Sequence, residues 1–287
     1  MRRDHLEKLA GNTAVITGAG SGLGRSLALN LARQGWTIGI SDVDAERAGC
    51  TLELVEKAGG SGEVYRCDVR DADQFGAMAR HFFAEWGGVS LLVNNAGIAV
   101  AGSVGDAEIS EWRRIVDVNL MGCVNGCHAF IPLMKRGGGG HIVNIASFAG
   151  IMNLPEMAPY NMTKAGVISL SETLSMELAP DRIGVTVACP TFFDTNLLDT
   201  MTCTNEFQTE FARSAFCNAR ITCDDVAASI LKGARKGKLY VMPQTSARLS
   251  WLAKRFFPLL TNRVFALGYR YGIARPVIMW MSKHGMV

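Results

Sequence analysis

Apolar residues recur with two different periods along this chain, and the two periods alternate. Short apolar runs such as 13–17 and 142–145 predict buried strands, whereas apolar positions three and four residues apart predict amphipathic helices. The predicted strands are 13–17, 36–41, 63–67, 89–93, 142–145, 185–188 and 239–242, and the predicted helices include 45–58, 71–86, 111–136, 158–179 and 224–235. Strands that alternate with helices form a parallel sheet covered by helices on both faces. We therefore expect a doubly wound α/β fold of about seven strands.

The last part of the chain differs in charge from the rest. Between residues 226 and 287 there are eleven Lys and Arg residues and no Asp or Glu, whereas the first 225 residues hold the other 18 bases and all 26 acids. Leu249, Leu252, Phe256 and Leu260 recur there at helical spacing, accompanied by Lys254, Arg255 and Arg263. Such a basic amphipathic helix can lie on an anionic membrane surface, but it can equally pack on its own domain or on a second subunit. We expect one domain over residues 1–244 and a C-terminal extension over 245–287.

Composition excludes several classes of protein. With 287 residues, 48% of them hydrophobic, the chain can bury a large core. Its eight cysteines form no CxxC pair, which favours reduced thiols in a cytoplasmic protein, and Cys123, Cys127 and His128 lack a second ligand pair for a metal. The charged start 1–5 has no apolar stretch typical of a signal peptide, and no run reaches the roughly 20 apolar residues that a membrane-spanning helix needs. The basic extension carries no motif for nucleic-acid binding.

A glycine-rich turn follows the first predicted strand and opens a helix. The stretch Thr17–Gly24 contains four glycines, of which Gly18, Gly22 and Gly24 have the spacing Gly-x-x-x-Gly-x-Gly. Glycines allow a tight turn and a close backbone approach to a pyrophosphate, whose charge suits the N-terminus of the helix. A plain flexible turn is the alternative, but the strand and helix on either side favour a dinucleotide site in a Rossmann-type sheet.

An acidic residue marks the end of the second predicted strand. Asp42 lies 18 residues after Gly24, where a carboxylate can accept hydrogen bonds from both ribose hydroxyls of an adenosine. It would also repel a 2′-phosphate, so we expect NAD(H) in preference to NADP(H). Alternatively Asp42 caps a helix, since Asp42 and Asp44 both precede one. Arg25 is a cation that can accommodate a phosphate, but we expect it to point along its helix.

A phenol and an ammonium lie four residues apart in the predicted helix 158–179. Tyr160 and Lys164 therefore fall on one face of the helix. A neighbouring cation favours the phenolate, so we expect the pKa of Tyr160 to fall below its ordinary value of about 10. Such a group can move a proton onto or off an alcohol oxygen. By itself such a pair more often marks a solvated helix face, and the rest of the chain is what favours catalysis.

These features together resemble the short-chain dehydrogenase/reductase family, over about Gly11 to Met242. The resemblance rests on the glycine turn, on Asp68 after the third strand, on Asn94-Asn95-Ala96-Gly97, on Asn119, on Ser147 and on the pair Tyr160 and Lys164. Ser147 precedes Tyr160 by thirteen residues, which is the usual spacing in the family. The resemblance implies a single Rossmann-fold catalytic domain with a substrate lid near residues 194–222.

The resemblance also implies catalytic roles for four residues. Tyr160 would be the general acid/base, and Lys164 would lower its pKa and bind the nicotinamide ribose. Ser147 would hold the substrate oxygen by a hydrogen bond, and Asn119 would support a water-linked proton path to Lys164. The structural alternatives are a helix defect at Asn119 and a strand-end cap at Ser147.

The cofactor-binding residues that the resemblance implies lie after successive strands. Asp68 and Val69 would contact adenine, the segment 95–97 would flank the adenosine, and Thr195 would meet the nicotinamide carboxamide. The full set is Gly18, Ser21, Gly22, Leu23, Gly24, Asp42, Asp68, Val69, Asn95, Ala96, Gly97, Tyr160, Lys164, Pro190 and Thr195. The chain departs from the family in having Pro190-Thr191 where Pro-Gly is usual, which can alter the local backbone.

The expected activity is NAD(H)-dependent interconversion of an alcohol and a ketone or aldehyde. Apolar residues of the lid and of the loop after the fifth strand suggest a lipophilic substrate, although the same residues suit ordinary core packing; they are Ile151, Met152, Leu154, Pro155, Met157, Leu197, Leu198, Met201, Phe207, Phe211 and Phe216. The alternatives are an NADP(H)-dependent carbonyl reductase and a catalytically silent, cofactor-sensing protein of the same fold. The resemblance also implies a homodimer or homotetramer.

Overall fold

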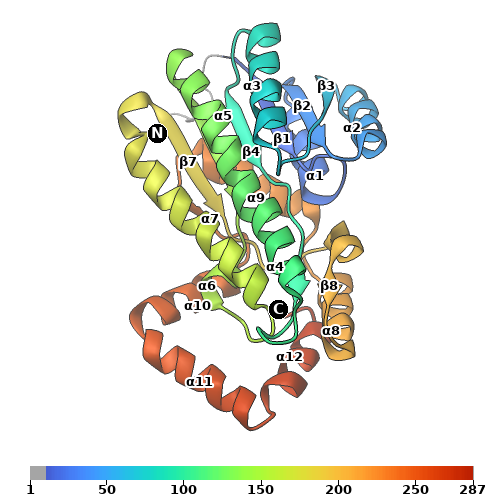
Figure 1. Ribbon diagram of the computed structural model, residues 1–287, viewed down its shortest axis with the longest axis vertical. Helices are drawn as coiled ribbons and strands as arrows, with labels where there is room; N and C mark the ends of the chain where they lie inside the picture. Colours follow the sequence, from blue (N-terminus) through green and yellow to red (C-terminus); the bar gives the residue numbers. More distant parts are fainter. Residues whose placement is uncertain (1–10, 287) are drawn as a thin grey trace.

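The fold is built on one parallel sheet of seven strands in the order β3-β2-β1-β4-β6-β7-β9 (Figure 1). The computed structural model describes residues 11–286. The charged start 1–5, from which we predicted that there is no signal peptide, lies outside the described residues. The strands are β1 (Thr13–Thr17), β2 (Thr37–Asp42), β3 (Ser61–Arg66), β4 (Leu91–Asn94), β6 (Gly140–Ile145), β7 (Ile183–Ala188) and β9 (Tyr240–Val241). The predicted doubly wound α/β fold is thus confirmed.

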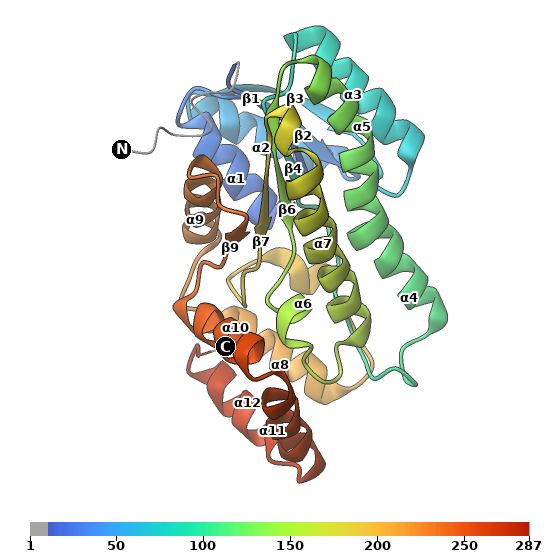
Figure 2. The same ribbon diagram turned by 90° about the vertical axis from the view of Figure 1, so that its left-hand side faces the viewer.

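Successive residues of each strand enter opposite layers of core, because side chains alternate across a sheet. Ile16 packs into the layer under α1 (Gly22–Ala32), α2 (Ala45–Lys57) and α9 (Cys223–Arg235). Its neighbour Val15 packs into the layer under α3 (Ala72–Trp86), α5 (Gly122–Arg136) and α7 (Ala158–Glu177). Figure 2 shows the two helical layers on either side of the sheet. Both faces are therefore buried, which explains the continuous apolar runs of the strands.

The long helix predicted over 111–136 is interrupted in the structure. It consists of α4 (Ile109–Ile115), a π-helical segment η2 (Val116–Met121) and α5. Asn119 lies in the π-helical segment and is 2% exposed. Short π-helical insertions in α-helices are frequent at functional sites. Hydrophobic periodicity does not reveal this insertion, because apolar residues continue on both sides of it.

Smaller elements lie beyond the carboxyl ends of the strands. They are the two-stranded sheet of β5 (Val100–Ala101) and β8 (Thr202–Cys203), the helices α6 (Ala149–Met152), η4 (Asn196–Thr200) and α8 (Glu206–Cys217), and the C-terminal helices α10 (Thr245–Phe256), α11 (Pro258–Arg270) and α12 (Ala274–Lys283). The short helix η3 (Ala179–Asp181) instead leads into the start of β7. Helices η4 and α8 occupy the segment 194–222 that we expected to form the lid. In the part of the chain that the structure describes, no helix is long and apolar enough to cross a membrane.

Candidate active site

The backbone of the glycine turn between β1 and α1 leaves no room for side chains at Gly18 and Gly22. Gly18 has a φ of 62° and Gly22 a φ of 50°, both in the left-handed region that favours glycine. A Cβ atom on Gly18 would lie 2.8 Å from the Cα atom of Ala96, and one on Gly22 would lie 2.9 Å from Oγ1 of Thr195. The turn therefore presents bare backbone to the N-terminus of α1, which is the arrangement that a pyrophosphate requires.

Two side chains lock this turn against the loop after β4. The Thr17 hydroxyl accepts hydrogen bonds from the backbone N–H groups of Asn95 and Ala96, at 3.0 and 3.1 Å. The Asn95 amide donates to the carbonyl oxygens of Thr17 and Gly18, at 2.9 and 3.1 Å. Asn95, which we expected beside the adenosine, thus uses its side chain to hold the turn. Sequence reasoning did not anticipate this positioning role.

The side chains of Ser21 and Leu23, the two other predicted residues of the turn, are not arranged to bind a cofactor, so only their backbone is available to one. Leu23 is buried in the core, and Ser21 makes no side-chain capping bond to α1, although its carbonyl oxygen accepts a hydrogen bond from the backbone of Arg25 at 3.1 Å.

Asp42 contacts the glycine turn directly. One of its carboxylate oxygens accepts a hydrogen bond from the Gly20 N–H at 2.8 Å, and the other accepts one from the Asp44 N–H at 3.0 Å. Asp44 is the residue that caps α2, by accepting hydrogen bonds from the N–H groups of Glu46 and Arg47. The capping role that we considered for Asp42 therefore belongs to Asp44, and Asp42 remains at the turn.

Arg25 does not point along its helix as expected. It folds back and donates hydrogen bonds to the carbonyl oxygen of Gly20 and to the hydroxyl of Thr51. These contacts place a cation beside the same turn that Asp42 contacts.

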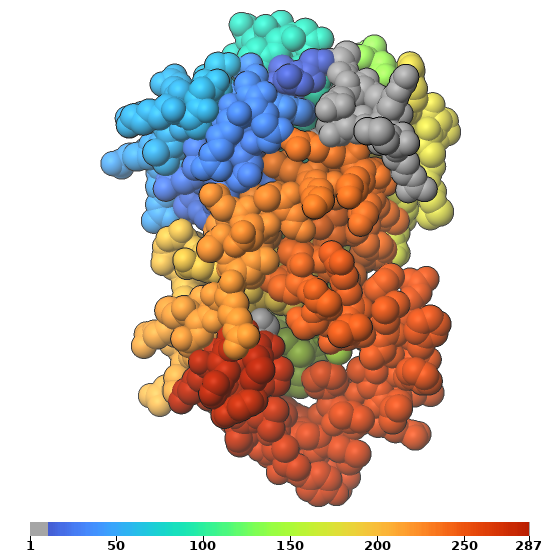
Figure 3. Space-filling view, turned by 180° about the vertical axis from the view of Figure 1, so that it is seen from behind, coloured from blue at the N-terminus to red at the C-terminus, as the bar shows by residue number. Residues whose placement is uncertain are grey.

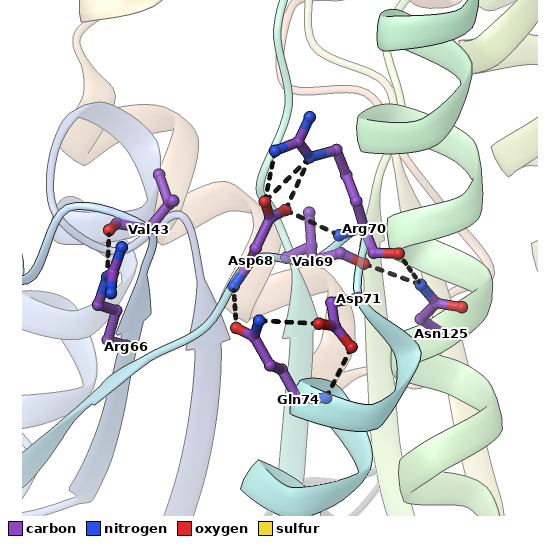
Figure 4. A network of polar contacts seen from close by, with 8 residues as sticks. All are labelled: Val43, Arg66, Asp68, Val69, Arg70, Asp71, Gln74 and Asn125. Carbon is purple, nitrogen blue, oxygen red and sulfur yellow. Dashed lines mark hydrogen bonds and ion pairs between the residues drawn. The ribbon is translucent and has the colours of Figure 1, made fainter.

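The loop after β3 is held by the polar network of Figure 4. The carboxylate of Asp68 forms an ion pair with Arg70 at 2.6 Å, and hydrogen bonds from Arg70 lower the pKa of Asp68. Asn125 of α5 donates a hydrogen bond to the carbonyl oxygen of Val69 at 2.9 Å. Arg70 and Asn125, which the sequence did not single out, thus fix the two residues that we expected to meet adenine.

Tyr160 and Lys164 lie in the first turns of α7, and Ser147 lies just after β6. The Lys164 ammonium nitrogen is 5.6 Å from the centre of the Tyr160 ring, so the two side chains share one helix face. The Tyr160 phenol lies near Ser147, whose side chain acts to lower the pKa of that phenol, and the Ser147 Oγ accepts a hydrogen bond from the Ala149 N–H at 3.1 Å. The structure therefore brings the three predicted residues together at the carboxyl end of the sheet.

The expectation of a lowered Tyr160 pKa is wrong for this structure. Burial raises the pKa of Tyr160 to about 12, and the Ser147 side chain opposes that rise only in part. Burial also lowers the pKa of Lys164 to about 8. Removal from water disfavours both charged forms, the phenolate and the ammonium. The two side chains do share a helix face as predicted, but their spacing alone does not reveal how far the site is buried from solvent.

Asn119 is fixed by a neighbouring loop. Its amide oxygen accepts a hydrogen bond from the Ile98 N–H at 2.8 Å, and its amide nitrogen donates to the Ile98 carbonyl at 2.9 Å and to Thr163 at 3.3 Å. A cavity of about 10 Å³ lies beside it, also lined by Thr17, Asn94 and Cys123. Such a volume is close to the least that holds one water molecule. A Cβ atom on Gly97 would lie 3.2 Å from the Asn119 oxygen and 3.5 Å from the Lys164 nitrogen.

The departure from Pro-Gly at Thr191 is accommodated by ordinary backbone geometry. Within residues 11–286, the non-glycine residues with positive φ are Asn153, Glu156 and Arg182, so Thr191 does not need the conformational freedom of glycine. Its N–H donates a hydrogen bond to the Gln244 side chain at 3.2 Å, and the Pro190 carbonyl accepts one from the Phe148 N–H at 2.9 Å. The chain after β7 is therefore anchored on both sides.

No metal site emerges from the side chains. Among residues 11–286 no group of three or more His, Cys, Asp and Glu side chains is placed to hold a metal ion, and all eight cysteines are free thiols.

Comparison with known proteins identifies the family. Residues 12–206 match the short chain dehydrogenase family. The chain belongs to this family. The Mycobacterium tuberculosis protein SadH, named as an oxidoreductase, is 34% identical over 267 residues, which are 92% of this chain and 97% of SadH. The resemblance inferred from the glycine turn and from Tyr160 and Lys164 is therefore confirmed.

Two further relatives match about two thirds of this chain, and a solved structure matches most of it. EphD of Mycobacterium tuberculosis, also named as an oxidoreductase, is 42% identical over 192 residues, but these are 66% of this chain and 32% of EphD. The 3-oxoacyl-[acyl-carrier-protein] reductase FabG of Staphylococcus aureus is 34% identical over 190 residues, 66% of this chain and 77% of FabG. A Burkholderia phymatum short-chain dehydrogenase/reductase solved in complex with NAD has a TM-score of 0.83 and 29% identity, covering 88% of this chain and 96% of its own.

Proposed function

We propose that this chain is an NAD(H)-dependent oxidoreductase that interconverts a lipophilic alcohol and its ketone or aldehyde. The observation that carries the proposal is the meeting of Ser147, Tyr160 and Lys164 at the carboxyl end of the sheet. Ligands of doubly wound sheets bind at that edge. A phenol and a hydroxyl that lie near each other there can together hold one oxygen atom of a substrate.

The residues present fit a nicotinamide dinucleotide. The backbone of Gly18–Gly24 and the N-terminus of α1 would hold the pyrophosphate, and the half-buried carboxylate of Asp42 would accept the hydroxyls of the adenosine ribose. Lys164 would bind the nicotinamide ribose, and Thr195 would meet the carboxamide. When bound, the nicotinamide ring accepts or donates the hydride of the reaction.

The choice of NAD(H) over NADP(H) rests on Asp42, because a carboxylate at the turn repels a 2′-phosphate. The second candidate, an NADP(H)-dependent carbonyl reductase, is favoured by Arg25 and Arg47, two cations close to the same turn. Both cations are already engaged, however. Arg25 donates to the Gly20 carbonyl, and Arg47 lies 3.3 Å from the carboxylate of Asp44.

The protonation state of Tyr160 favours reduction at neutral pH. Because burial raises the pKa of Tyr160 to about 12, the phenol is protonated and can donate its proton to an oxygen that gains negative charge. Ser147 would hold that oxygen during the transfer. In the direction of alcohol oxidation the phenolate must form first, and the Lys164 ammonium supplies the nearest positive charge that stabilises it.

Aromatic side chains support a lipophilic substrate. Phe207 and Phe211 of α8 stack with their ring centres 6.3 Å apart, and Phe192 contacts Phe211 and Phe216 at 5.6 and 5.2 Å. Helix α8 is tied to the loop before α7 by a hydrogen bond of 3.0 Å from Gln208 to Glu156. These aromatic side chains therefore lie on an element that is attached to the loop leading to Tyr160. FabG, whose name describes reduction of an acyl ketone, is consistent with this substrate class.

A titration of NADH and NADPH by cofactor fluorescence, followed by a panel of secondary alcohols, long-chain aldehydes and steroids, tests the proposal. We expect tighter binding of NADH than of NADPH and turnover of at least one lipophilic carbonyl. Binding of NADH without turnover of any member would instead favour the catalytically silent, cofactor-sensing protein.

A further inference from the structure

Helix α11 lies on the outside of the molecule. None of its residues, all of which the structure describes, is buried against the rest of the described chain. Leu260, Val264 and Leu267 follow one another at spacings of four and three residues and form one apolar stripe, while Arg263 and Arg270 lie seven residues apart beside it. The stripe is 49–60% exposed. A helix of a soluble domain normally buries its apolar stripe, so this face requires another explanation.

The turn between α10 and α11 exposes even more apolar surface. Phe256, Phe257, Leu259 and Leu260, which we call the apolar corner, are 72%, 61%, 75% and 60% exposed. Single exposed hydrophobic residues are normal on protein surfaces, but four large ones within five residues are not. The turn between α10 and α11 lies on the side of the C-terminal helices, beyond the carboxyl ends of the strands (Figures 1 and 2).

The charge around the apolar corner has one sign. Residues 245–287 contain seven Lys and Arg residues and no Asp or Glu. Arg255, Arg263 and Arg270 are all exposed next to the corner or the stripe. Among the described residues, none of these three forms an ion pair. A second copy of this chain would bring an equally basic surface against them, which like-charge repulsion opposes.

The inner side of the extension is attached firmly to the substrate end of the domain. Arg275 and Tyr269 contact one carboxylate oxygen of Glu156, at 2.6 and 3.1 Å, and Gln208 of α8 contacts the other. Burial acts to raise the pKa of Glu156, but the hydrogen bonds from Arg275, Gln208 and Tyr269 outweigh it and lower that pKa. Lys254 of α10 donates a hydrogen bond to the Ile151 carbonyl.

These contacts explain the orientation of the extension. Figure 3 shows the C-terminal helices grouped at one end of the molecule, next to the segment that carries α8. The side that contacts Glu156 faces the loop before α7. The exposed apolar corner and the three arginines Arg255, Arg263 and Arg270 therefore remain available to an external partner.

We propose that the apolar corner and the basic face of α11 dock this chain onto the surface of an anionic lipid bilayer. The four apolar side chains of the corner would enter the boundary between headgroups and acyl chains, and Arg255, Arg263 and Arg270 would bind lipid phosphates. Docking in this orientation would bring the loop before α7 and helix α8 close to the bilayer. A substrate dissolved in the membrane would then have a short path to Tyr160, a consequence that rests on the proposed function.

Sedimentation with phosphatidylcholine vesicles, with and without about 30% phosphatidylglycerol, tests the docking. The full chain is expected to pellet with the anionic vesicles and to remain in the supernatant with phosphatidylcholine alone. The double substitution Arg263→Gln and Arg270→Gln is expected to weaken binding about 25-fold, or roughly fivefold for each cation. Its matched control is Lys232→Gln with Lys236→Gln, two exposed cations of the domain, which is expected to bind as the wild type does.

The apolar contribution is tested by Leu259→Ser with Leu260→Ser, which is expected to weaken binding at least about tenfold. Met176→Ser, at a position that is 70% exposed on α7, is the matched control. These substitutions remove no buried contact, so folding is preserved and circular dichroism verifies it.

Failure of the wild type to pellet with anionic vesicles overturns the proposal, as does binding that both double variants leave unchanged. A smaller mass in solution for the Leu259→Ser, Leu260→Ser variant, without vesicle binding by the wild type, would assign the corner to a second copy. The assay measures binding alone, so its failure leaves the proposed oxidoreductase activity untouched.

Discussion

The ammonium nitrogen of Lys164 donates a hydrogen bond to the carbonyl oxygen of Ile145, the last residue of β6, at 2.8 Å. This bond fixes the side chain that shares a helix face with Tyr160 to the edge of the sheet. It also holds a charged group where only 4% of the residue is exposed. Burial lowers the pKa of Lys164 from 10.5 to about 8, so keeping this lysine charged at neutral pH works against folding.

Replacing Lys164 by methionine is therefore expected to stabilise the protein while it removes activity. At pH 7 removing the buried charge should raise the free energy of unfolding by about 1 to 3 kcal/mol. The loss of the hydrogen bond to Ile145 reduces this gain. Below the folded pKa the wild type bears the full cost of the buried charge. Between that pKa and 10.5 the folded lysine is neutral while the unfolded one is charged, so the wild type gains stability as pH rises.

The difference between variant and wild type should accordingly shrink from about pH 8 upward, as measured by urea unfolding at several pH values. Lys57→Met, at an exposed position of α2, is the control and should change little. A variant less stable than the wild type at pH 7 would show that the bond to Ile145 outweighs the cost of burying the charge.

Replacing Tyr160 by phenylalanine removes the proton donor and leaves the ring in place. We expect turnover to fall at least about a hundredfold while NADH binding is retained. Tyr240→Phe, which removes a phenol that is hydrogen-bonded to Glu172, should keep most of its activity. Near wild-type turnover of Tyr160→Phe would refute the catalytic role of this phenol.

The two directions of the reaction are expected to respond differently to pH. With the pKa of Tyr160 at about 12, the phenol stays protonated over the neutral range, so carbonyl reduction should be nearly flat there. Alcohol oxidation needs the phenolate, whose fraction rises tenfold for each pH unit below that pKa, so kcat/KM should climb from about pH 7 to about pH 10. A plateau beginning near pH 8 in the wild type would contradict this profile and would show either a much more acidic phenol in the loaded enzyme or the loss of the Lys164 charge, whose pKa is about 8.

Replacing Asp42 by alanine is expected to relax the choice of cofactor. The carboxylate holds the Gly20 N–H and would also hold the ribose hydroxyls, so its loss should weaken NADH binding about tenfold or more. NADPH binding should improve, because the charge that repels a 2′-phosphate is gone. Asp44→Ala, which removes only the cap of α2, should lower stability without changing the ratio of the two affinities. An unchanged ratio in Asp42→Ala would remove Asp42 from cofactor selection.

Gly18 and Gly35 form a matched pair for testing the glycine turn. Both have positive φ, 62° and 74°, but a Cβ atom on Gly35 meets nothing within 4 Å, whereas one on Gly18 would overlap Ala96. Gly35→Ala should cost about 1 kcal/mol of stability for the backbone strain alone. Gly18→Ala should cost clearly more and should also weaken NADH binding. Equal losses in the two variants, by thermal unfolding and cofactor titration, would mean that the turn yields to an added methyl group.

Much of the fold followed from local pattern. The continuous apolar runs of the strands and the helical spacing between them determined the doubly wound sheet, because both signals depend only on which residues must avoid water. The glycine turn and the pair of Tyr160 and Lys164 could also be predicted from the sequence, since each needs fixed residue types at a fixed spacing. The π-helical interruption at Asn119 was not, because the apolar periodicity of helix 111–136 passes through it.

The sequence by itself thus determined the family, the doubly wound parallel class of the fold and the candidate site residues of this short-chain dehydrogenase, since these depend on spacing along one chain, whereas the strand order came from the structure. Only the tertiary structure decided that burial raises the pKa of Tyr160, that Arg25 turns back to Gly20, and that the extension is fastened to Glu156 on one side and exposed on the other. Each of these depends on groups that are distant in sequence, or on how much water reaches a side chain. Neither quantity is encoded in local periodicity, because solvation and long-range contacts exist only once the chain has folded.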